Sequence, residues 1–351
     1  MEPSLIVSGS FDQTIRVWRK PKKLFTFEKV GNLSPILEVL KFLSPEEVIG
    51  IARVNKQFYE ASFHSEVLKP GFRQTRVLEY NNGTVWSVAV SLKKGILVSA
   101  SDDSTIQVWS LATGQVTQVL KGHSSTVYSV AISSDEEWIV SGSGDTTLRV
   151  WSLASGLTTL VLTGHSSVVW SVAISSKDQF IVSASWDDTL RVWSLTTGEV
   201  IRILQGHSDS VRSVAISKGD RYIVSASNDS TVRVWSLASG DLVRVLKGHN
   251  DIVFSVGISS DEQFVVSGSL DNTIRVWSLT SGETTRVLEG HPGRVLSVKL
   301  SSDDKYLVSG GGNRSLFSAG DDSVRVWDLS TGLQTQELKG HTDWVWSVNL
   351  A

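Results

Sequence analysis

One stretch of sequence, KGHSSTVYSVAISSDEEWIVSGSGDTTLRVWSL at residues 121–153, recurs along this chain and limits its fold more than any other feature. Its Gly-His pair returns at a spacing of 42 residues, with a longer last step of 50, at His123, His165, His207, His249, His291 and His341. Val-Trp pairs keep the same spacing from Trp109 to Trp277 and reach Trp327 after 50 residues. A fixed period of this length indicates a repeat architecture, in which each unit buries its apolar face against its neighbours.

Each repeat predicts four short β-strands. In the copy above, TVYSVAIS (126–133), WIVSGS (138–143) and LRVWSL (148–153) alternate apolar with small or polar residues. Clusters of Asp, Gly and Ser separate them, as turns separate strands. The segment TTLVLT (158–163), ahead of the next Gly-His pair, supplies the fourth strand. The pattern therefore predicts an all-β chain.

The order Gly-His, Ser-x-Ser-x-Asp and Val-Trp resembles the repeat of the WD-repeat family. The resemblance covers most of the chain and implies a β-propeller, in which the repeats form four-stranded blades around a central channel. The Trp-Asp pair that gives the family its name is present at Trp327-Asp328 and is mostly Trp-Ser in the other repeats.

The two ends of the chain predict one shared blade. Residues 5–18, LIVSGSFDQTIRVW, contain the second and third strands of a repeat without a first strand. Residues 340–351, GHTDWVWSVNLA, contain a Gly-His loop and a first strand with nothing after it. Trp18 and the six later Val-Trp pairs then give seven blades. We therefore expect a seven-bladed propeller closed by both termini, since closure removes an exposed sheet edge.

Composition narrows the location and the class of partner. The 351 residues are 40% hydrophobic and 20% charged, with a formal net charge of −3. The chain therefore has no overall positive charge that would attract nucleic acid. The absence of cysteine suits a reducing compartment. We recognise no signal peptide and no apolar run of the ~20 residues that a membrane helix needs. These features predict an intracellular protein, cytoplasmic or nuclear, that binds neither nucleic acid nor membrane.

The repeat spacing breaks between Trp18 and Trp109, where 91 residues replace the usual 42. Ser34-Pro35 and Ser44-Pro45-Glu46-Glu47 are helix N-cap signals with proline at the first helical position. We therefore expect residues 1–29 to begin the propeller, residues 30–72 to form a small α-helical insertion and residues 73–351 to complete the propeller. An insertion of this size has to bury its apolar residues against the propeller or another protein.

Residues 36–69 of this insertion resemble an F-box. Phe42-Leu43 ends a first helix, Ser44-Pro45 begins a second, and Val54 precedes a basic residue and an aromatic pair. The resemblance implies binding to the adaptor of an SCF-type ubiquitin ligase, through Ile36, Leu37, Leu40, Leu43, Pro45 and Val54. A helical insertion that only packs on the ring is the alternative.

The outer strand of the first blade has two candidates. Residues 24–28 (LFTFE) and residues 75–79 (TRVLE) both have a suitable register. We favour the second, because it matches residues 117–120 one period further along the chain.

The last repeat contains eight extra residues between Tyr306 and Trp327. Its second strand ends at either Val308-Ser309 or Phe317-Ser318. The glycines at 310–312 predict a mobile loop. Such a loop either docks a partner or is a tolerated surface insertion.

Histidine, serine and aspartate recur too regularly to form one catalytic centre. By resemblance to the family, each Gly-His histidine joins a buried hydrogen-bond network, here His123, Ser141, Asp145 and Trp151. The set repeats in other blades, whereas a catalytic triad occurs once. The glycines at 310–312 lack the lysine of a phosphate-binding loop. We therefore expect no enzyme, no cofactor and no metal site.

Large side chains vary between repeats at two kinds of position on one face of the predicted propeller. One position lies five residues after the Gly-His histidine, and the other directly precedes the turn aspartate. Aromatic residues and arginine dominate protein-binding hot spots, so we expect a protein-binding face made of Trp86, Tyr128, Trp170, Trp186, Arg212, Phe254, Arg294, Trp344 and Trp346. Arg212, Arg294 and Arg314 are candidates to receive an acidic or phosphorylated residue. The alternative is that the large side chains only plug the channel.

These expectations combine into a protein-interaction module that acts as a monomer within a complex. The favoured hypothesis is a substrate receptor of an SCF-type ubiquitin ligase, with the adaptor on the insertion and a protein or peptide on the propeller face. The alternative is a non-catalytic scaffold or assembly subunit whose insertion is a docking element.

Overall fold

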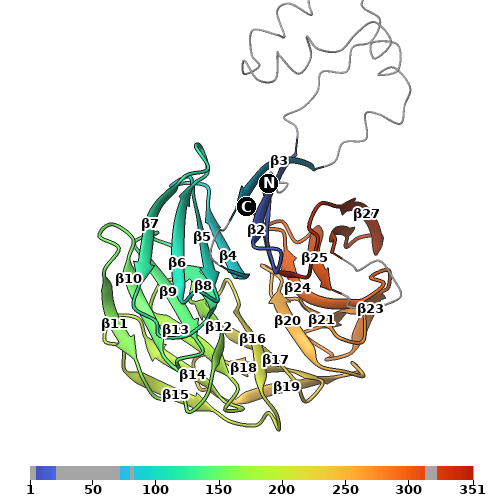
Figure 1. The fold of residues 1–351 in the computed structure, drawn as a ribbon. Helices are drawn as coiled ribbons and strands as arrows, with labels where there is room; N and C mark the ends of the chain where they lie inside the picture. Colours follow the sequence, from blue (N-terminus) through green and yellow to red (C-terminus); the bar gives the residue numbers. More distant parts are fainter. Residues whose placement is uncertain (1–4, 21–71, 80–82, 313–321, 351) are drawn as a thin grey trace, which may run out of the picture. The chain divides into compact units, whose positions relative to one another are not determined.

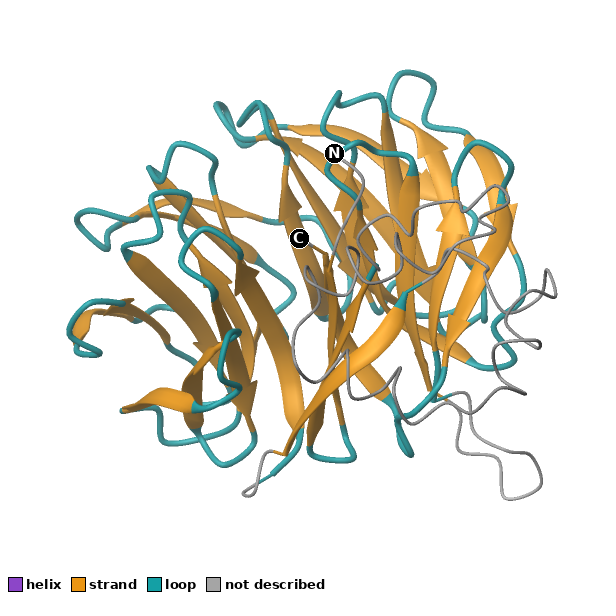
Figure 2. Ribbon diagram, turned by 90° about the horizontal axis from the view of Figure 1, so that it is seen from above, coloured by secondary structure: helices purple, strands orange, loops and turns teal. Residues whose placement is uncertain are grey.

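A computed structural model of the chain describes residues 5–20, 72–79, 83–312 and 322–350. Within these ranges every regular element is a β-strand, as Figure 2 shows, so they include no helix of the length and apolarity needed to cross a membrane. The propeller unit comprises Met1–Arg19 and Gln74–Ala351, and Lys20–Arg73 form a separate unit. The helical insertion expected at residues 30–72 lies, apart from Phe72, outside the described residues.

The described strands form seven four-stranded antiparallel sheets, here called blades A to G, arranged around a centre (Figure 1). In blades B to G the strands follow chain order from the channel outward. Blade A contains β28 (Val345–Leu350), β1 (Leu5–Ser10), β2 (Thr14–Arg19) and β3 (Arg73–Glu79). Blade B contains β4 (Val85–Ser91), β5 (Ile96–Ser101), β6 (Thr105–Ser110) and β7 (Val116–Lys121).

Blade C contains β8 (Val127–Ile132), β9 (Trp138–Ser143), β10 (Leu148–Ser152) and β11 (Thr158–Leu162). Blade D contains β12 (Val169–Ile174), β13 (Phe180–Ser185), β14 (Leu190–Ser194) and β15 (Val200–Leu204). Blade E contains β16 (Val211–Ile216), β17 (Tyr222–Ser227), β18 (Thr231–Ser236) and β19 (Leu242–Lys247). Blade F contains β20 (Val253–Ile258), β21 (Phe264–Ser269), β22 (Ile274–Ser278) and β23 (Thr284–Leu288). Blade G contains β24 (Arg294–Leu300), β25 (Tyr306–Gly312), β26 (Val324–Asp328) and β27 (Leu333–Leu338).

Blade A joins the two ends of the chain and closes the ring. Its inner strand β28 pairs antiparallel with β1, with Ile6 opposite Leu350 and Val7 opposite Asn349. The inner strand β28 also contacts β24 and β4, the inner strands on its two sides. The seven-bladed propeller closed by both termini is therefore confirmed. Of the two candidates for the outer strand, the one that includes residues 75–79 lies beside β2, as β3.

The apolar core lies between neighbouring blades. Val98 and Ile106 of blade B pack in one buried cluster with Val127, Ile139 and Trp151 of blade C. The second strand of each blade is covered on both faces by the neighbouring blades. For this reason its sequence consists almost entirely of apolar and small residues. The repeat therefore folds only in the company of adjacent repeats.

The prediction of a mobile loop at the glycines of blade G is wrong. Residues 310–312 continue β25 and pair with β24. Ser309, on the same strand, bonds His291 Nε2 at 2.6 Å and accepts from Trp327 Nε1 at 2.8 Å. The second strand therefore includes Val308-Ser309, the first of the two predicted ends, but continues to Gly312. Glycine is needed there because a Cβ on Gly310 would lie 2.8 Å from Val345 Cγ1 and 2.9 Å from its carbonyl oxygen.

A buried hydrogen-bond network joins the Gly-His loop of a blade to its second and third strands. His123 Nδ1 lies 2.8 Å from Asp145 Oδ2, and its Nε2 lies 2.8 Å from Ser141 Oγ. Trp151 Nε1 donates to the same Ser141 Oγ at 2.9 Å. Since the carboxylate only accepts, His123 donates to it from Nδ1, and its Nε2 shares a hydrogen bond with the Ser141 hydroxyl. Equivalent contacts centre on His165, His207 and His249.

In blade A this network connects the two chain ends. His341, next to β28, lies 2.6 Å from Ser8 Oγ and 3.0 Å from Asp12 Oδ2. Burial lowers the pKa of His341, and the hydrogen bond and charge of Asp12 oppose this shift without cancelling it. Burial by itself would raise the pKa of the Asp12 carboxyl, but hydrogen bonds from His341 and Thr14 hold it well below its usual range.

A second set of hydrogen bonds links each inner strand to the next one around the ring. Seven serines, the channel serines, each accept the backbone N–H of a valine on an adjacent inner strand at 3.0–3.2 Å. The channel serines are Ser87, Ser129, Ser171, Ser213, Ser255, Ser297 and Ser347. The set is continuous, because Ser297 accepts from Val348 and Ser347 accepts from Val88. Blade A is therefore held on both sides in the same way as the others.

Carboxylates link neighbouring blades at the opposite end of the strands. Asp178, in the turn between β12 and β13, accepts from the backbone N–H groups of Ser134 at 2.8 Å and Asp135 at 2.9 Å in blade C. Asp220, Glu262 and Asp304 also accept from backbone N–H groups of the preceding blade, and Glu136 accepts from the Ser91 hydroxyl of blade B. Blade A has no such turn in the described residues, because its two inner strands are chain ends.

Removing a channel serine should destabilise the propeller. In Ser129→Ala the buried N–H of Val172 loses its 3.1 Å acceptor, and an unpaired buried donor costs about 1–3 kcal/mol. Chemical denaturation measures the change in the free energy of unfolding. The matched variant Ser208→Ala, at an exposed loop position, should change it by less than about 0.5 kcal/mol. Equal effects of the two substitutions would contradict a structural role for the serine set.

The contact between the chain ends should make stability depend on pH. Because the folded pKa of His341 lies below the unfolded value of about 6.5, the unfolded chain binds protons more readily, and the free energy of unfolding falls as pH drops below about 6.5. The low pKa of Asp12 and its counterparts adds a further loss below about pH 4. Denaturation curves at several pH values measure both losses. His341→Gln should reduce the slope near pH 6, and an unchanged slope in that variant would exclude His341 as its source.

Candidate functional site

A β-bulge in each inner strand turns one side chain toward the mouth of the channel. On β12, Val169 pairs with Ser185 and Ser171 pairs with Ala184, so Trp170 is the extra residue of the bulge. A bulge re-aims the side chain of its unpaired residue. The same irregularity occurs in all seven inner strands. The seven bulge residues, called the mouth residues, are Trp86, Tyr128, Trp170, Arg212, Phe254, Leu296 and Trp346.

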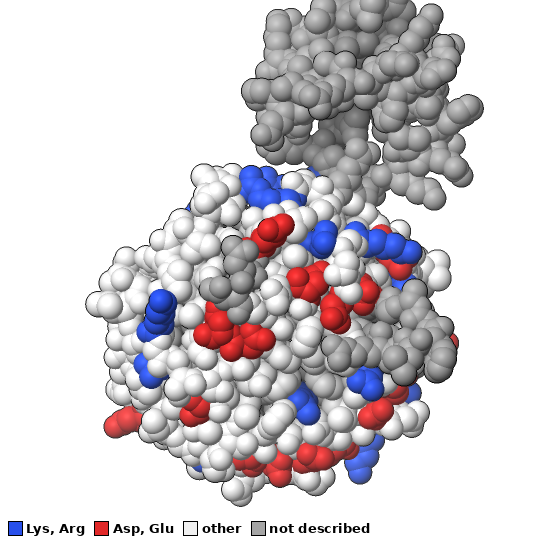
Figure 3. Space-filling model, viewed as in Figure 1, with Lys and Arg blue, Asp and Glu red and all other residues white. Residues whose placement is uncertain are grey.

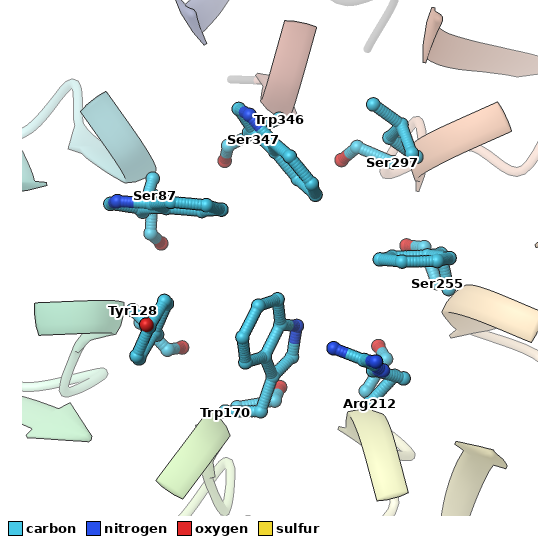
Figure 4. A pocket seen from close by; sticks show the side chains of 14 residues that line it. Ser87, Tyr128, Trp170, Arg212, Ser255, Ser297, Trp346 and Ser347 are labelled. Carbon is cyan, nitrogen blue, oxygen red and sulfur yellow. The ribbon is translucent and has the colours of Figure 1, made fainter. Parts of the chain in front are cut away.

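The mouth residues and the channel serines line one pocket of about 490 Å³, a volume that includes solvent at its open end. Figure 4 shows the labelled side chains of Tyr128, Trp170, Arg212 and Trp346 arranged around this opening. Each channel serine directly follows a mouth residue in the sequence. The hydrogen bonds between blades therefore fix the backbone from which each mouth side chain projects.

Trp86 is at the centre of an aromatic cluster in the mouth. Its ring centroid lies 5.1 Å from that of Tyr128, 5.8 Å from Trp170 and 4.6 Å from Trp346. Tyr128 and Trp170 stack at 4.4 Å with an interplanar angle of 22°. Offset and edge-to-face pairs at these distances are favourable beyond their buried area, so the cluster is a rigid apolar surface.

The cluster extends onto the loops around the mouth. Trp186, in the turn after β13, stacks on Trp170 at 5.3 Å and 13° and keeps 37% of its surface exposed. Trp344, ahead of β28, lies 5.6 Å from Trp346, and Arg294 lies over its ring. Gly312 makes room for this arrangement, because a Cβ there would lie 2.7 Å from Trp344 Cγ. The structure thus brings together all nine residues of the protein-binding face expected from the sequence.

Arg212 is the charged member of the mouth residues. Its guanidinium carbon lies 4.6 Å from the ring centroid of Trp170, 4.9 Å from Trp186 and 5.1 Å from Phe254. Its Nε donates to Asn228 Oδ1 at 2.7 Å. Burial lowers the pKa of Arg212 to about 10, against the opposing charges of Asp209 and Tyr128. The group therefore stays protonated at neutral pH.

Two indole N–H groups in the mouth have no acceptor. Trp86 Nε1 and Trp346 Nε1 are buried and make no hydrogen bond within the described parts of the chain. Nearly all buried polar groups in folded proteins are paired, so each exception calls for an explanation. These donors are suited to carbonyl or carboxylate oxygens of a bound molecule.

Lys299 adds an amino group to the inner strand of blade G. It lies two residues after Ser297 on β24, where other blades have Ala89, Ala131 or Gly257. Its side chain keeps accessible surface, yet burial among protein atoms lowers its pKa. A side chain that faces the interior of the channel would be both accessible to solvent and surrounded by protein atoms.

Arg314 and the six insertion residues proposed to bind an adaptor lie outside the described residues. The roles of Asn228 and of the channel serines were missed. Serine follows every mouth position in the sequence, and this recurrence could have predicted the channel serines. Serine is also frequent at other positions of the repeat, so the recurrence alone does not distinguish them.

The face seen in Figure 3 carries both Lys and Arg side chains and several groups of Asp and Glu side chains. Across the described ranges, no three His, Asp or Glu side chains are grouped so that they could hold a metal ion. The character of the mouth is therefore aromatic, with a local positive charge.

Comparison with known families agrees with the repeat spacing. The family model described as WD domain, G-beta repeat matches residues 2–19, 72–110, 114–152, 156–194, 198–236, 240–278 and 282–328. These segments make up most of the chain, and each of the six longer ones contains the outer strand of one blade and the first three strands of the next. No match to a curated protein is found.

Proposed function

This chain belongs to the WD-repeat family of β-propellers, which are general protein-interaction modules, and from this we propose that its channel mouth binds a protein or peptide. The observation that carries the proposal is the aromatic cluster with its two unpaired, buried indole donors. A protein or peptide ligand with carbonyl or carboxylate oxygens would pair both donors. Trp186 and Phe11, both more than a third exposed, extend the apolar surface outward for a partner to cover.

The second part of the proposal concerns the insertion. We propose that residues 36–69 act as an F-box and recruit the adaptor of an SCF-type ubiquitin ligase, so that the propeller is the substrate receptor. The support is the sequence pattern Phe42-Leu43, Ser44-Pro45 and Val54. The alternative is a scaffold whose insertion docks elsewhere.

We further propose that the protein is not an enzyme. Histidine, serine and aspartate side chains form the same hydrogen-bond network with one another, and with tryptophan, in blades C and D. A nucleophile and its base in one catalytic centre would break that repetition. The proposed activity is binding.

Mutation of the insertion tests the adaptor hypothesis. A pull-down with purified SCF adaptor should capture the wild-type chain and fail with Leu40→Asp plus Leu43→Asp, because two buried charges would disrupt an apolar interface. Circular dichroism on the variant checks that the propeller stays folded. Failure of the wild-type chain to bind the adaptor would exclude the ligase hypothesis and leave the scaffold.

Mutation of the mouth tests the binding hypothesis independently of the insertion. A synthetic library of random hexapeptides, screened by fluorescence anisotropy, should contain binders whose affinity falls roughly thirtyfold in Trp86→Ala, since truncating a hot-spot residue costs about 2 kcal/mol or more. The control Leu157→Ala removes an exposed apolar side chain on the outer part of blade C and should leave the affinity unchanged. A library without binders, or equal loss in the two variants, would argue against the mouth as the binding site.

A further inference from the structure

In blades A, E and F the outer strand reaches the next blade through one arginine side chain. Arg76 of β3 donates from Nη1 to the carbonyl oxygen of Leu111 at 3.3 Å and from Nη2 to that of Ala112 at 3.1 Å. Both carbonyls belong to the turn between β6 and β7 of blade B. Arg244 and Arg286 bond the corresponding pairs of carbonyls in blades F and G. At each of these junctions one guanidinium therefore spans two adjacent carbonyl groups.

The junction between blades B and C has a glutamine in place of this arginine. The two blades are neighbours in the ring (Figure 1). Gln118 of β7 directly follows Thr117, as Arg76 follows Thr75, and both threonine hydroxyls donate to a valine carbonyl of the third strand. Gln118 and Arg76 are therefore equivalent positions. The glutamine side chain is shorter, and it carries no guanidinium for the next blade.

Three hydrogen-bond acceptors lack a donor at this junction. The carbonyl oxygens of Leu153 and Ala154 correspond to the two that Arg76 bonds in blade B, and they accept no hydrogen bond from the described residues. Oε1 of Gln118 is buried and is also unpaired within the described parts of the chain. Nearly all buried polar groups in folded proteins are paired. The position thus keeps the acceptors of the other junctions without their donor.

Residues at this junction line a pocket of about 600 Å³, a volume that includes solvent at its open end. Its wall includes Ile96, Val108, Thr117, Gln118, Leu153 and Ala154. Ile96 is the first residue of its second strand, where blades C to G carry an aromatic side chain, so this position is also less filled. Lys94 completes the wall, and its amino group donates to the carbonyl oxygen of Glu136. Since Lys94 is in the turn that follows β4, the pocket lies at the end of the blades opposite the mouth.

From this comparison between junctions we propose that the pocket between blades B and C is a second protein-binding site, which takes the guanidinium of an arginine side chain from a partner protein. The guanidinium donates to the carbonyl oxygens of Leu153 and Ala154 and to Oε1 of Gln118, and the aliphatic stem lies against Ile96. Hydrogen bonds from a charged donor are stronger than those from a neutral one. The planar fork of arginine spans two carbonyls, whereas the ammonium group of lysine is a compact point charge.

Three blocked tripeptides test the proposal, each acetyl-Gly-Xaa-Gly-amide with arginine, citrulline or lysine at the centre. They are titrated into the full-length chain with isotope-labelled Ile, Leu and Ala methyl groups. The methyl signals of Ile96, Leu153 and Ala154 should shift with the arginine peptide and report an affinity roughly tenfold or more above that of the neutral citrulline peptide, as expected for hydrogen bonds to a charged group. The lysine peptide should also bind more weakly than the arginine peptide.

A pair of matched substitutions assigns the preference to the pocket. Gln118→Arg supplies the chain's own guanidinium to the two carbonyls, so the arginine peptide should lose its advantage over the citrulline peptide at Ile96. Gln115→Arg makes the same change at an exposed position just before β7 and should preserve the wild-type preference. The second variant excludes an effect of the added charge alone.

A third variant opens the equivalent pocket at another junction. Arg76→Gln removes the guanidinium between blades A and B, where Leu5 takes the position of Ile96. The arginine peptide should then occupy a second saturable site, reported by the methyl signals of Leu111 and Ala112. In the wild-type chain those signals should not respond, because Arg76 already bonds both carbonyls.

The readout separates this proposal from binding at the mouth. Equal affinities for the arginine and citrulline peptides, or no shift at the pocket methyl groups, would overturn the proposal and leave the function of the mouth untouched. A preference for arginine that survives in Gln118→Arg would overturn it as well. Trp86→Ala, which alters the mouth, should leave the response at Ile96 unchanged, and a lost response there would place the peptide at the mouth instead.

Discussion

The hydrogen bond between a serine on one inner strand and a backbone N–H on the adjacent one is the interaction on which the rest of this propeller depends. It recurs seven times without a gap and holds the inner strands at a constant spacing. Each bond contributes only about 0.5–1.5 kcal/mol net. Their main consequence is geometric, because the bulge residue before each serine is fixed in direction and the mouth side chains converge.

Closure at blade A depends on several different interactions. β28 and β1 pair as strands, His341 bonds Ser8 and Asp12, and the serine set crosses the blade on both sides. Among the described residues, blade A has none of the carboxylate contacts that link the turns at the opposite end. The bonds from His341 to Ser8 and Asp12 place one contact between the chain ends close in sequence to Trp344 and Trp346.

The mouth shows how identical backbone positions acquire different chemistry. Seven equivalent bulges carry five aromatic side chains, one leucine and one arginine, and the arginine lies where rings from three other positions meet. Rings arranged in this way attract cations, and here the cation is the chain's own Arg212.

The sequence by itself determined the number of blades, their strands and the closure by both ends, because period and alternation are local properties that each repeat restates. It also placed nine large side chains on one face. Only the tertiary structure decided that Gly310 to Gly312 continue a strand, since the reason is the nearness of Val345 and Trp344 from another blade. The cluster around Trp86 and the bridge from Asp209 through Asn228 to Arg212 likewise join positions of different repeats or different loops, and their distances are fixed by closing the ring. These contacts are made by residues that differ from repeat to repeat, so they leave no periodic trace in the sequence, and for that physical reason they had to be seen in the folded chain.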